Sequence, residues 1–258
     1  MTTLLTHLES LRSAGRKLLV PYLMGAFPQP DAYAEALLAV AEHADAVEVG
    51  LPYSDPLMDG PVIASAGERV IRDGAGPVRV LDLTAEIESR VPRIVMTYYN
   101  PIHRMGETEF CRRASVAGFS GLIVPDLPLE ESESLRSVAA GDGLAWVGLV
   151  APTSPPERIA AVAEATTGFV YAVSTLGVTG TRDALAVSAR RVVAACRAAT
   201  DLPVLVGIGV SNAEQARAAA TTADGVVIGS AVVRAVLEEG AEGARAFLAG
   251  VRGGLDTL

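Results

Sequence analysis

The sequence predicts an α/β fold, a (β/α)8 TIM barrel with an extra N-terminal helix. Eight short β-rich runs each precede a stretch with helical periodicity, and such strict alternation builds a parallel sheet. The 258 residues contain no Pro/Ser-rich linker and no shift of composition, so we expect a single barrel domain over 1–258. The alternative is an open doubly wound sheet, but the first β-α turn lacks the glycine fingerprint of a dinucleotide site.

The predicted elements follow in order along the chain. Leu4, Leu5, Leu8 and Leu11 have helical spacing and predict the extra helix over 2–14. The expected strands are 18–23, 46–51, 94–98, 121–124, 145–150, 168–173, 204–206 and 225–228. The other expected helices are 31–43, 62–73, 77–90, 107–117, 130–140, 156–165, 186–199, a segment starting near 211, and one or two helices in 231–252.

Composition excludes several classes of function. The net charge of −9 argues against nucleic acid or an anionic membrane surface as the binding partner. No apolar run approaches the ~20 residues of a spanning helix, and residues 1–16 lack the apolar core of a signal peptide. Cys111 and Cys196 have no metal-ligand spacing and are expected to be free buried thiols. Together these features predict a cytoplasmic protein in a reducing compartment.

Metal ligands and lysines are scarce. The three histidines are scattered, so we expect no metal site. Lys17 is the only lysine, and it precedes the first predicted strand. In such a barrel the active site lies at the carboxyl ends of the strands. Since Lys17 would lie at the opposite end, the sequence disfavours a lysine Schiff base.

Glu48 is an acid inside an apolar run. Side chains alternate along a strand, so Glu48 shares a face with the small residues Ala46 and Gly50, which leave room beside it. A buried acid is costly unless it is paired or protonated. Either a neighbouring hydroxyl or arginine satisfies Glu48, or its carboxyl has a raised pKa and is poised for proton transfer. Asp59, in the following Pro/Gly-rich loop, is the natural second group, although an Asp before Gly is commonly a turn residue.

Small residues collect after the last three predicted strands. Exposed backbone N–H groups and helix N-termini bind phosphate without a cation, and these loops are the usual phosphate position in this fold. We therefore expect a short phosphate-binding helix after strand 8. Any one of these glycines alone is more commonly a turn residue, so the prediction depends on their joint placement. The glycine-containing segments are Thr179-Gly180, Gly207-Ile208-Gly209 and Gly229-Ser230.

The residues alone thus indicate a barrel enzyme for a small phosphorylated substrate. Two carboxylates would act without a metal or a Schiff base. This chemistry fits isomerisation, or C–C cleavage of a substrate that carries its own electron sink. A sugar-phosphate or amino-sugar isomerase is an alternative, but the paired Asp or strand-end Lys common in such enzymes is not found.

Distinctive short motifs occur at the predicted strand ends. The most specific is Glu48 followed by Pro52-Tyr53-Ser54-Asp55-Pro56 and Asp59-Gly60-Pro61. The others are Asn100-Pro101, Pro125-Asp126-Leu127-Pro128, Gly177-Val178-Thr179-Gly180, Gly207-Ile208-Gly209 and Gly229-Ser230. Together they resemble the signature of the tryptophan synthase α subunit family, from strand 1 to the helix after strand 8.

The resemblance implies a lyase that cleaves indole-3-glycerol phosphate to indole and glyceraldehyde 3-phosphate without cofactor or metal. It implies that Glu48 is the acid/base and that Asp59 holds the indole N–H. Tyr171 would support Glu48 or the glycerol hydroxyls. The implied phosphate residues are Thr179, Gly180, Gly209, Gly229 and Ser230. The implied walls of the indole pocket are Tyr22, Met96, Ile123 and Ile208.

The resemblance also implies a partner, a pyridoxal-phosphate-dependent β subunit that takes up indole through a tunnel in an αββα assembly. The loops after strands 2 and 6 would act as lids. The residues implied to face the partner are Asp55, Pro56, Asn100, Asp126 and Pro128.

The sequence departs from the family pattern at a few positions. Met58, Val62 and Ala64 replace other common residues near Asp59, and Arg104 stands where a partner-contacting Asn is often found. These departures leave open a stand-alone indole-releasing lyase or a different partner. A non-catalytic regulatory subunit is a further alternative, which the intact pair of acids disfavours.

Overall fold

The computed structural model describes residues 3–173, 182–207 and 212–258. Its strands are β1 (Leu18–Met24), β2 (Val47–Gly50), β3 (Arg93–Met96), β4 (Phe119–Ile123), β5 (Ala145–Trp146), β6 (Gly148–Val150), β7 (Val170–Val173), β8 (Val204–Gly207) and β9 (Gly225–Ile228). Its α-helices are α1 (Leu4–Ser13), α2 (Tyr33–Ala41), α3 (Pro61–Arg72), α4 (Pro77–Ala85), α5 (Tyr99–Met105), α6 (Glu107–Val116), α7 (Glu133–Gly141), α8 (Pro156–Ala165), α9 (Arg182–Ala199), α10 (Ala213–Ala220) and α11 (Ser230–Leu255). Two short 3-10 helices, Pro30–Ala32 and Leu129–Glu131, precede α2 and α7.

All nine strands are parallel and form one sheet in the order β5-β4-β3-β2-β1-β9-β8-β7-β6. Only Val147 separates β5 from β6, so they are two halves of the run expected over 145–150. β5 pairs with β4 and β6 pairs with β7, and the sheet therefore closes through this one broken strand. The predicted (β/α)8 barrel is confirmed.

The break in the fifth strand has a local cause. The Trp146 carbonyl accepts hydrogen bonds from the N–H groups of both Thr167 and Gly168, and the Thr167 hydroxyl accepts from the Trp146 N–H. Val147 instead donates its N–H to Leu122 of β4. The hydrogen-bonding partner of this strand thus changes at Val147, and the strand is divided there into β5 and β6.

Side chains of the strands alternate between two apolar layers. Val47 and Val49 of β2 pack into the cluster between the sheet and the outer helices, whereas Ala46 lies in the barrel interior. Glu48 follows Ala46 on the inward face, as the alternation predicts. The interior residues in the strands or next to their ends are Leu18, Val20, Ala46, Ile94, Ile123, Val147, Phe169, Leu205 and Val227.

The extra N-terminal helix closes the bottom of the barrel. Leu4 and Leu8 of α1 are buried in the interior cluster, and the Thr3 hydroxyl caps the helix by accepting from the Thr6 N–H. A Cβ on Gly121 would come within 2.7 Å of the Leu4 side chain, so the glycine leaves the space that Leu4 of this helix occupies. The amino-terminal end is therefore filled, and only the carboxyl-terminal end is left for a ligand.

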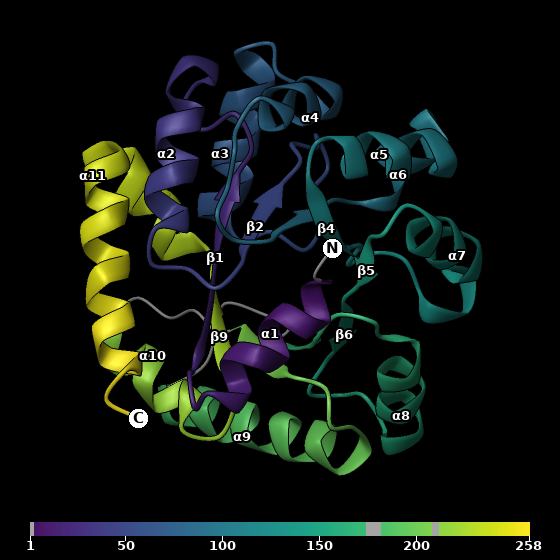
Figure 1. Cartoon of the computed structure of the whole chain (residues 1–258), viewed down its shortest axis with the longest axis vertical. Helices are drawn as coiled ribbons and strands as arrows, with labels where there is room; N and C mark the ends of the chain where they lie inside the picture. Colours follow the sequence, from purple (N-terminus) through teal and green to yellow (C-terminus); the bar gives the residue numbers. More distant parts are fainter. Residues whose placement is uncertain (1–2, 174–181, 208–211) are drawn as a thin grey trace.

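Two helices differ from the expectation in instructive ways. α11 contains Gly240 at φ 67°, which separates a short helix directly after β9 from a longer one that runs beside α2 (Figure 1). This short segment is the helix expected after strand 8. α5 was not expected, because Asn100-Pro101 resembles a helix breaker. Pro101 is its third residue, where a helix needs no N–H donor, so proline is tolerated.

A buried ionic cluster fastens the amino-terminal end. The Asp45 carboxylate, ahead of β2, accepts from Arg16 Nε at 2.6 Å, from the Leu19 N–H at 2.8 Å and from Arg252 at 3.1 Å. The Arg252 guanidinium also donates to the Lys17 carbonyl. Asp45 thereby joins β1, β2 and the carboxyl-terminal part of α11.

We expect Asp45→Ala to lower the free energy of unfolding by about 3–5 kcal/mol, because it removes the buried carboxylate beside the Arg252 guanidinium, whose other carboxylate partner, Asp256, is exposed. Urea unfolding followed by circular dichroism measures this. Glu42→Ala is the matched control, since it removes an exposed ion pair with Arg245 and should cost less than about 1 kcal/mol. Equal losses in the two variants would contradict the role assigned to Asp45.

Candidate active site

The strand register brings several predicted site residues to one end of the barrel. Tyr22 of β1 is paired with Glu48 of β2. Two residues closer to the carboxyl end, Gly50, Met96 and Ile123 are in register across β2, β3 and β4. Paired residues of parallel strands point to the same face. The side chains of Tyr22, Glu48, Met96 and Ile123 therefore form the floor of the open end, which is partly polar and partly apolar.

Glu48 is buried without full hydrogen bonding. The residue is only 4% exposed, and its Oε2 atom has no hydrogen-bond partner among the described residues. Of the two interpretations that the sequence leaves open, the structure thus favours an acid that no neighbouring arginine satisfies. Burial raises the pKa of Glu48 to about 8, and the nearby Asp59 carboxyl adds to the rise.

Asp59 lies in the loop between β2 and α3 and faces the same region. Burial raises its pKa to about 6, while a hydrogen bond with Tyr98 opposes this rise. At neutral pH the two groups therefore differ: Glu48 is mostly protonated and Asp59 is mostly ionised. Two acids with separated pKa values are the arrangement that divides a proton donor from an anionic acceptor.

Two tyrosines flank Glu48, and each occupies space that a glycine provides. A Cβ on Gly50 would lie 2.0 Å from the Tyr22 hydroxyl, and one on Gly207 would lie 2.3 Å from the Tyr171 ring. The room that the sequence predicts beside Glu48 is therefore partly filled by Tyr22. Burial is the main cause that raises the pKa of both phenols. The Asp59 and Glu48 charges raise the pKa of Tyr22 further, and the Glu48 charge raises that of Tyr171. Both phenols remain neutral donors near the carboxyls.

Tyr98 is a third tyrosine at this end, and the sequence analysis missed it. It lies just beyond Thr97 after β3, is buried, and accepts a hydrogen bond from the Met58 N–H at 2.9 Å through its hydroxyl oxygen. Its ring lies 5.3 Å from that of Tyr53. The available signal was its place: it is the second residue after a buried strand, at the carboxyl end where functional groups collect.

The expected phosphate residues are only partly described. Gly229 is the N-cap of α11, and Ser230 is the first residue of that helix. A Cβ on Gly229 would approach Ile63 at 3.1 Å and the Tyr22 side chain at 3.7 Å, so this helix start adjoins the Tyr22 side of the site. Thr179, Gly180, Ile208 and Gly209 lie outside the described residues.

The residues expected to face a partner lie around the open end, Asn100 at the start of α5 and the others on the loops after β2 and β4. Asp55, Asn100, Asp126 and Pro128 are exposed, and Pro56 is partly buried. Asp126 accepts the Tyr99 N–H at 2.8 Å, which ties the loop after β4 to the start of α5. Beside them, Leu57 is 88% exposed.

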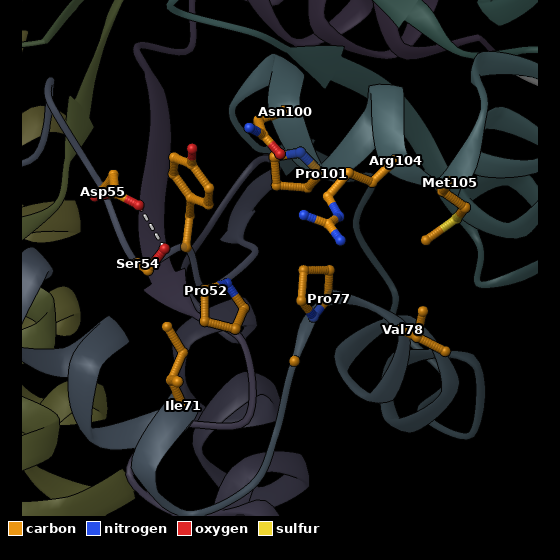
Figure 2. A pocket seen from close by; sticks show the side chains of 12 residues that line it. Pro52, Ser54, Asp55, Ile71, Pro77, Val78, Asn100, Pro101, Arg104 and Met105 are labelled. Carbon is orange, nitrogen blue, oxygen red and sulfur yellow. Dashed lines mark hydrogen bonds between the residues drawn. The ribbon is translucent and has the colours of Figure 1, made fainter.

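A cavity of about 600 Å³ lies beside this face, between the loop after β2, the α3–α4 turn and α5. Figure 2 shows the Arg104 side chain extending into it between Pro101 and Pro77. Neither Glu48 nor Asp59 lines this cavity. It therefore belongs to the outer face of the loops and not to the floor around Glu48.

In the described ranges, neither the potential metal ligands nor Lys17 form a second candidate site. There, no group of three His, Cys, Asp or Glu side chains could hold a metal ion. The Lys17 amine donates to the Ala223 carbonyl ahead of β9, at the amino-terminal end. In the same part of the chain, no helix is long and apolar enough to cross a membrane.

Comparison with known proteins agrees with this geometry. The profile of the tryptophan synthase alpha chain family matches residues 8–251. The tryptophan synthase alpha chain of Gloeobacter violaceus is 50% identical over 219 residues, which cover 83% of this chain and 79% of that one. The Streptomyces avermitilis alpha chain is 45% identical over 259 residues, covering 96% and 94%.

The chain belongs to the tryptophan synthase alpha chain family. Solved structures support the assignment. A chain of Mycobacterium tuberculosis tryptophan synthase superposes with a TM-score of 0.91 at 40% identity, covering 99% of both chains. Tryptophan synthase subunit alpha from Legionella pneumophila gives 0.91 at 29% identity and covers all of both chains. As a tryptophan synthase alpha chain, the protein is a lyase of tryptophan biosynthesis.

We expect Glu48→Gln to stabilise this alpha chain at high pH. Glu48 ionises near its ordinary value of 4.5 when unfolded but near 8 when folded, so the folded state binds more protons in between. Wild-type stability therefore falls as pH rises through this window, and glutamine removes that loss. Urea unfolding should show a gain of a few kcal/mol at pH 8 and almost none at pH 4.5, since each pKa unit corresponds to about 1.4 kcal/mol.

Glu164→Gln is the control, because it makes the same substitution on the exposed face of α8. It should show no comparable gain at pH 8. A Glu48→Gln stability difference that is flat between pH 4.5 and 8 would contradict a raised pKa for Glu48.

Proposed function

We propose that this chain cleaves indole-3-glycerol phosphate to indole and glyceraldehyde 3-phosphate through Glu48 and Asp59. One feature carries the proposal: two carboxyls whose pKa values are raised to about 8 and about 6, mainly by burial, lie at the open end of the barrel, beside the start of α11. Cleavage of this substrate needs a proton donor at the indole ring and a negative charge at its nitrogen. The protonated Glu48 and the ionised Asp59 have those two properties.

The proposed reaction begins with proton transfer. Glu48 gives its proton to the indole carbon that carries the glycerol chain, and the Asp59 carboxylate accepts a hydrogen bond from the ring N–H and balances the positive charge. The Glu48 carboxylate then takes the proton of the glycerol hydroxyl next to the ring. The C–C bond breaks, its electron pair returns to the indole ring, and the hydroxyl carbon becomes the aldehyde. Glu48 ends protonated, as it began.

The same proposal assigns the surrounding residues. Tyr22, Met96 and Ile123 would contact the indole ring together with Ile208, because Tyr22 is paired with Glu48 and the register places Met96 and Ile123 beside Gly50, towards the open end of the barrel. Tyr171, whose ring lies over Gly207, would support Glu48 or the glycerol hydroxyls. The phosphate would bind at the N-terminus of α11 through backbone N–H groups, which need no cation. The residues proposed for the phosphate are Thr179, Gly180, Gly209, Gly229 and Ser230.

We further propose that the chain works as the α subunit of an αββα tryptophan synthase in the cytoplasm. The chain itself would need no cofactor, and pyridoxal phosphate would belong to the β subunit. Asp55, Pro56, Asn100, Asp126 and Pro128 would contact that partner. The adjacent exposed side chains of Leu57 and Met58 support this surface, because neighbouring apolar side chains left in solvent suit a protein interface.

Glu48→Gln is expected to abolish indole release, by about a thousandfold or more, while glyceraldehyde phosphate still binds, because the proposed phosphate contacts are backbone N–H groups of other residues. Asp59→Asn should retain a small residual rate, since its amide oxygen still accepts the indole N–H. Indole release is followed spectroscopically and phosphate-ligand binding by calorimetry. Wild-type turnover in Glu48→Gln would contradict the acid/base role.

Indole release by the purified chain, alone and with an added tryptophan synthase β subunit, tests the function as a whole. Slow release that accelerates strongly with the β subunit is the expected result for a biosynthetic α subunit. Fast release without any partner would instead identify a stand-alone indole-releasing lyase. Absence of release in both conditions would contradict the catalytic proposal and favour a regulatory subunit.

A further inference from the structure

Tyr22 lies directly across the sheet from Glu48. The strand register pairs these two residues, and Tyr22 is only 3% exposed. Gly50 is the next inward-facing position of β2 after Glu48, because side chains alternate along a strand. A Cβ on Gly50 would overlap the Tyr22 hydroxyl oxygen and would lie 2.5 Å from the ring carbon that bears it. The Tyr22 hydroxyl therefore occupies the space next to Glu48, on the side of the open end.

The base of the same side chain adjoins the start of α11. A Cβ on Gly229, the N-cap of that helix, would lie 3.7 Å from the Tyr22 Cβ and 3.9 Å from the ring Cδ1. The Tyr22 ring thus runs from the helix start proposed for the phosphate to the hydroxyl beside Glu48. A substrate that reaches both places would lie along this ring.

The Tyr22 hydroxyl has only a weak acceptor among the described residues. It donates to the Met24 Sδ at 3.9 Å, two residues further along the same strand. A thioether sulfur is a weak hydrogen-bond acceptor, whereas an ionised carboxylate is a strong one. In the same part of the chain, the buried Glu48 Oε2 has no hydrogen-bond partner. The register thus pairs a weakly used donor with an acid oxygen that has no donor.

The proposed reaction makes Glu48 a strong acceptor for part of each cycle. Once Glu48 has given its proton to the indole carbon, it is a buried carboxylate, and an unpaired buried charge is costly. Burial and the charges of Asp59 and Glu48 raise the pKa of Tyr22, so the phenol keeps its proton. Tyr22 can therefore donate a hydrogen bond to the carboxylate without transferring a proton to it.

The other groups that face Glu48 are less suited to this task. Asp59, in the loop between β2 and α3, is itself an acid, and its charge disfavours ionisation of Glu48. Tyr171 belongs to β7, which does not pair with β2, and it is only partly buried. Over the described ranges, no cationic side chain contributes to the pKa of Glu48. Tyr22 is thus the buried neutral donor on a strand that pairs with β2.

We propose that the Tyr22 hydroxyl is a reserve donor, which rests on the Met24 sulfur and turns to the Glu48 carboxylate when Glu48 has protonated the substrate. The inference rests on the proposed lyase reaction and adds a positioning residue to it. The hydrogen bond would hold the carboxylate until it takes the proton of the glycerol hydroxyl. No covalent bond of Tyr22 forms or breaks, and the phenol proton stays on its oxygen.

Tyr22→Phe tests the proposal, because it keeps the buried ring and removes only the hydroxyl. We expect kcat for indole release to fall about tenfold to a hundredfold, the range for losing a hydrogen bond to a charged group. KM should stay within about twofold of wild type, because the ring remains and the lost interaction exists only after the first proton transfer.

Two control variants separate this role from packing. Tyr33→Phe removes another buried phenol oxygen, which bonds the Thr84 hydroxyl at 2.9 Å away from the site, and should keep kcat within about twofold of wild type. Met24→Leu removes the weak acceptor and keeps a buried apolar side chain of similar size. It should also keep kcat within about twofold, because the proposed function of the hydroxyl is exercised at Glu48.

A second readout needs no turnover. The carboxylic-acid C=O band of Glu48 is assigned by infrared difference against Glu48→Gln and is followed with pH in the full chain. The pH at which this band disappears should rise by about one unit or more in Tyr22→Phe, because a hydrogen bond that favours the ionised form is lost. It should not change in Tyr33→Phe. A role of Tyr22 in packing alone would not move this midpoint, since phenylalanine keeps the ring.

Unchanged kcat in Tyr22→Phe, an equal loss of kcat in Met24→Leu, or an unchanged midpoint of the Glu48 band would each overturn the proposal. If the wild type releases no indole, the proposed function fails, and the infrared titration still decides whether Tyr22 donates to Glu48. Indole release together with an unmoved midpoint would leave the function intact and remove the role of Tyr22.

Discussion

Glu48 places a carboxyl group at the end of β2 where water does not reach, and desolvation makes its charged form costly. Much of the site follows from this cost. The group stays protonated at neutral pH, Oε2 has no hydrogen-bond partner among the described residues, and the nearby Asp59 is the acid that ionises. The folded protein thus holds a proton donor and an anion in one small space.

The barrel separates this costly site from the features that stabilise it. At the amino-terminal end, Leu4 and Leu8 plug the interior and Asp45 joins three elements through buried hydrogen bonds. At the carboxyl end, glycines at 50 and 207 admit tyrosine rings beside Glu48. Stability and chemistry therefore reside at opposite ends of the same strands, as expected for this fold.

The sequence was sufficient for features that depend on periodicity. β-α alternation predicted the barrel, and the alternation within β2 placed Glu48 on the inward face. It was insufficient for features that depend on contacts between segments far apart in the sequence. The filling of the Gly50 space by Tyr22 and the bond from Met58 to Tyr98 depend on how β1, β2 and β3 are aligned, which no local pattern records. α5 was missed because a proline that is tolerated in a first turn resembles a breaker.

The most direct test of this account is the protonation state of Glu48, measured by infrared difference spectroscopy between the wild type and Glu48→Gln. The account predicts a carboxylic-acid C=O band at pH 7 that is absent in Glu48→Gln and disappears as the pH rises through about 8. A wild-type spectrum without this band at pH 7, with Glu48 already ionised above its ordinary value near 4.5, would contradict it.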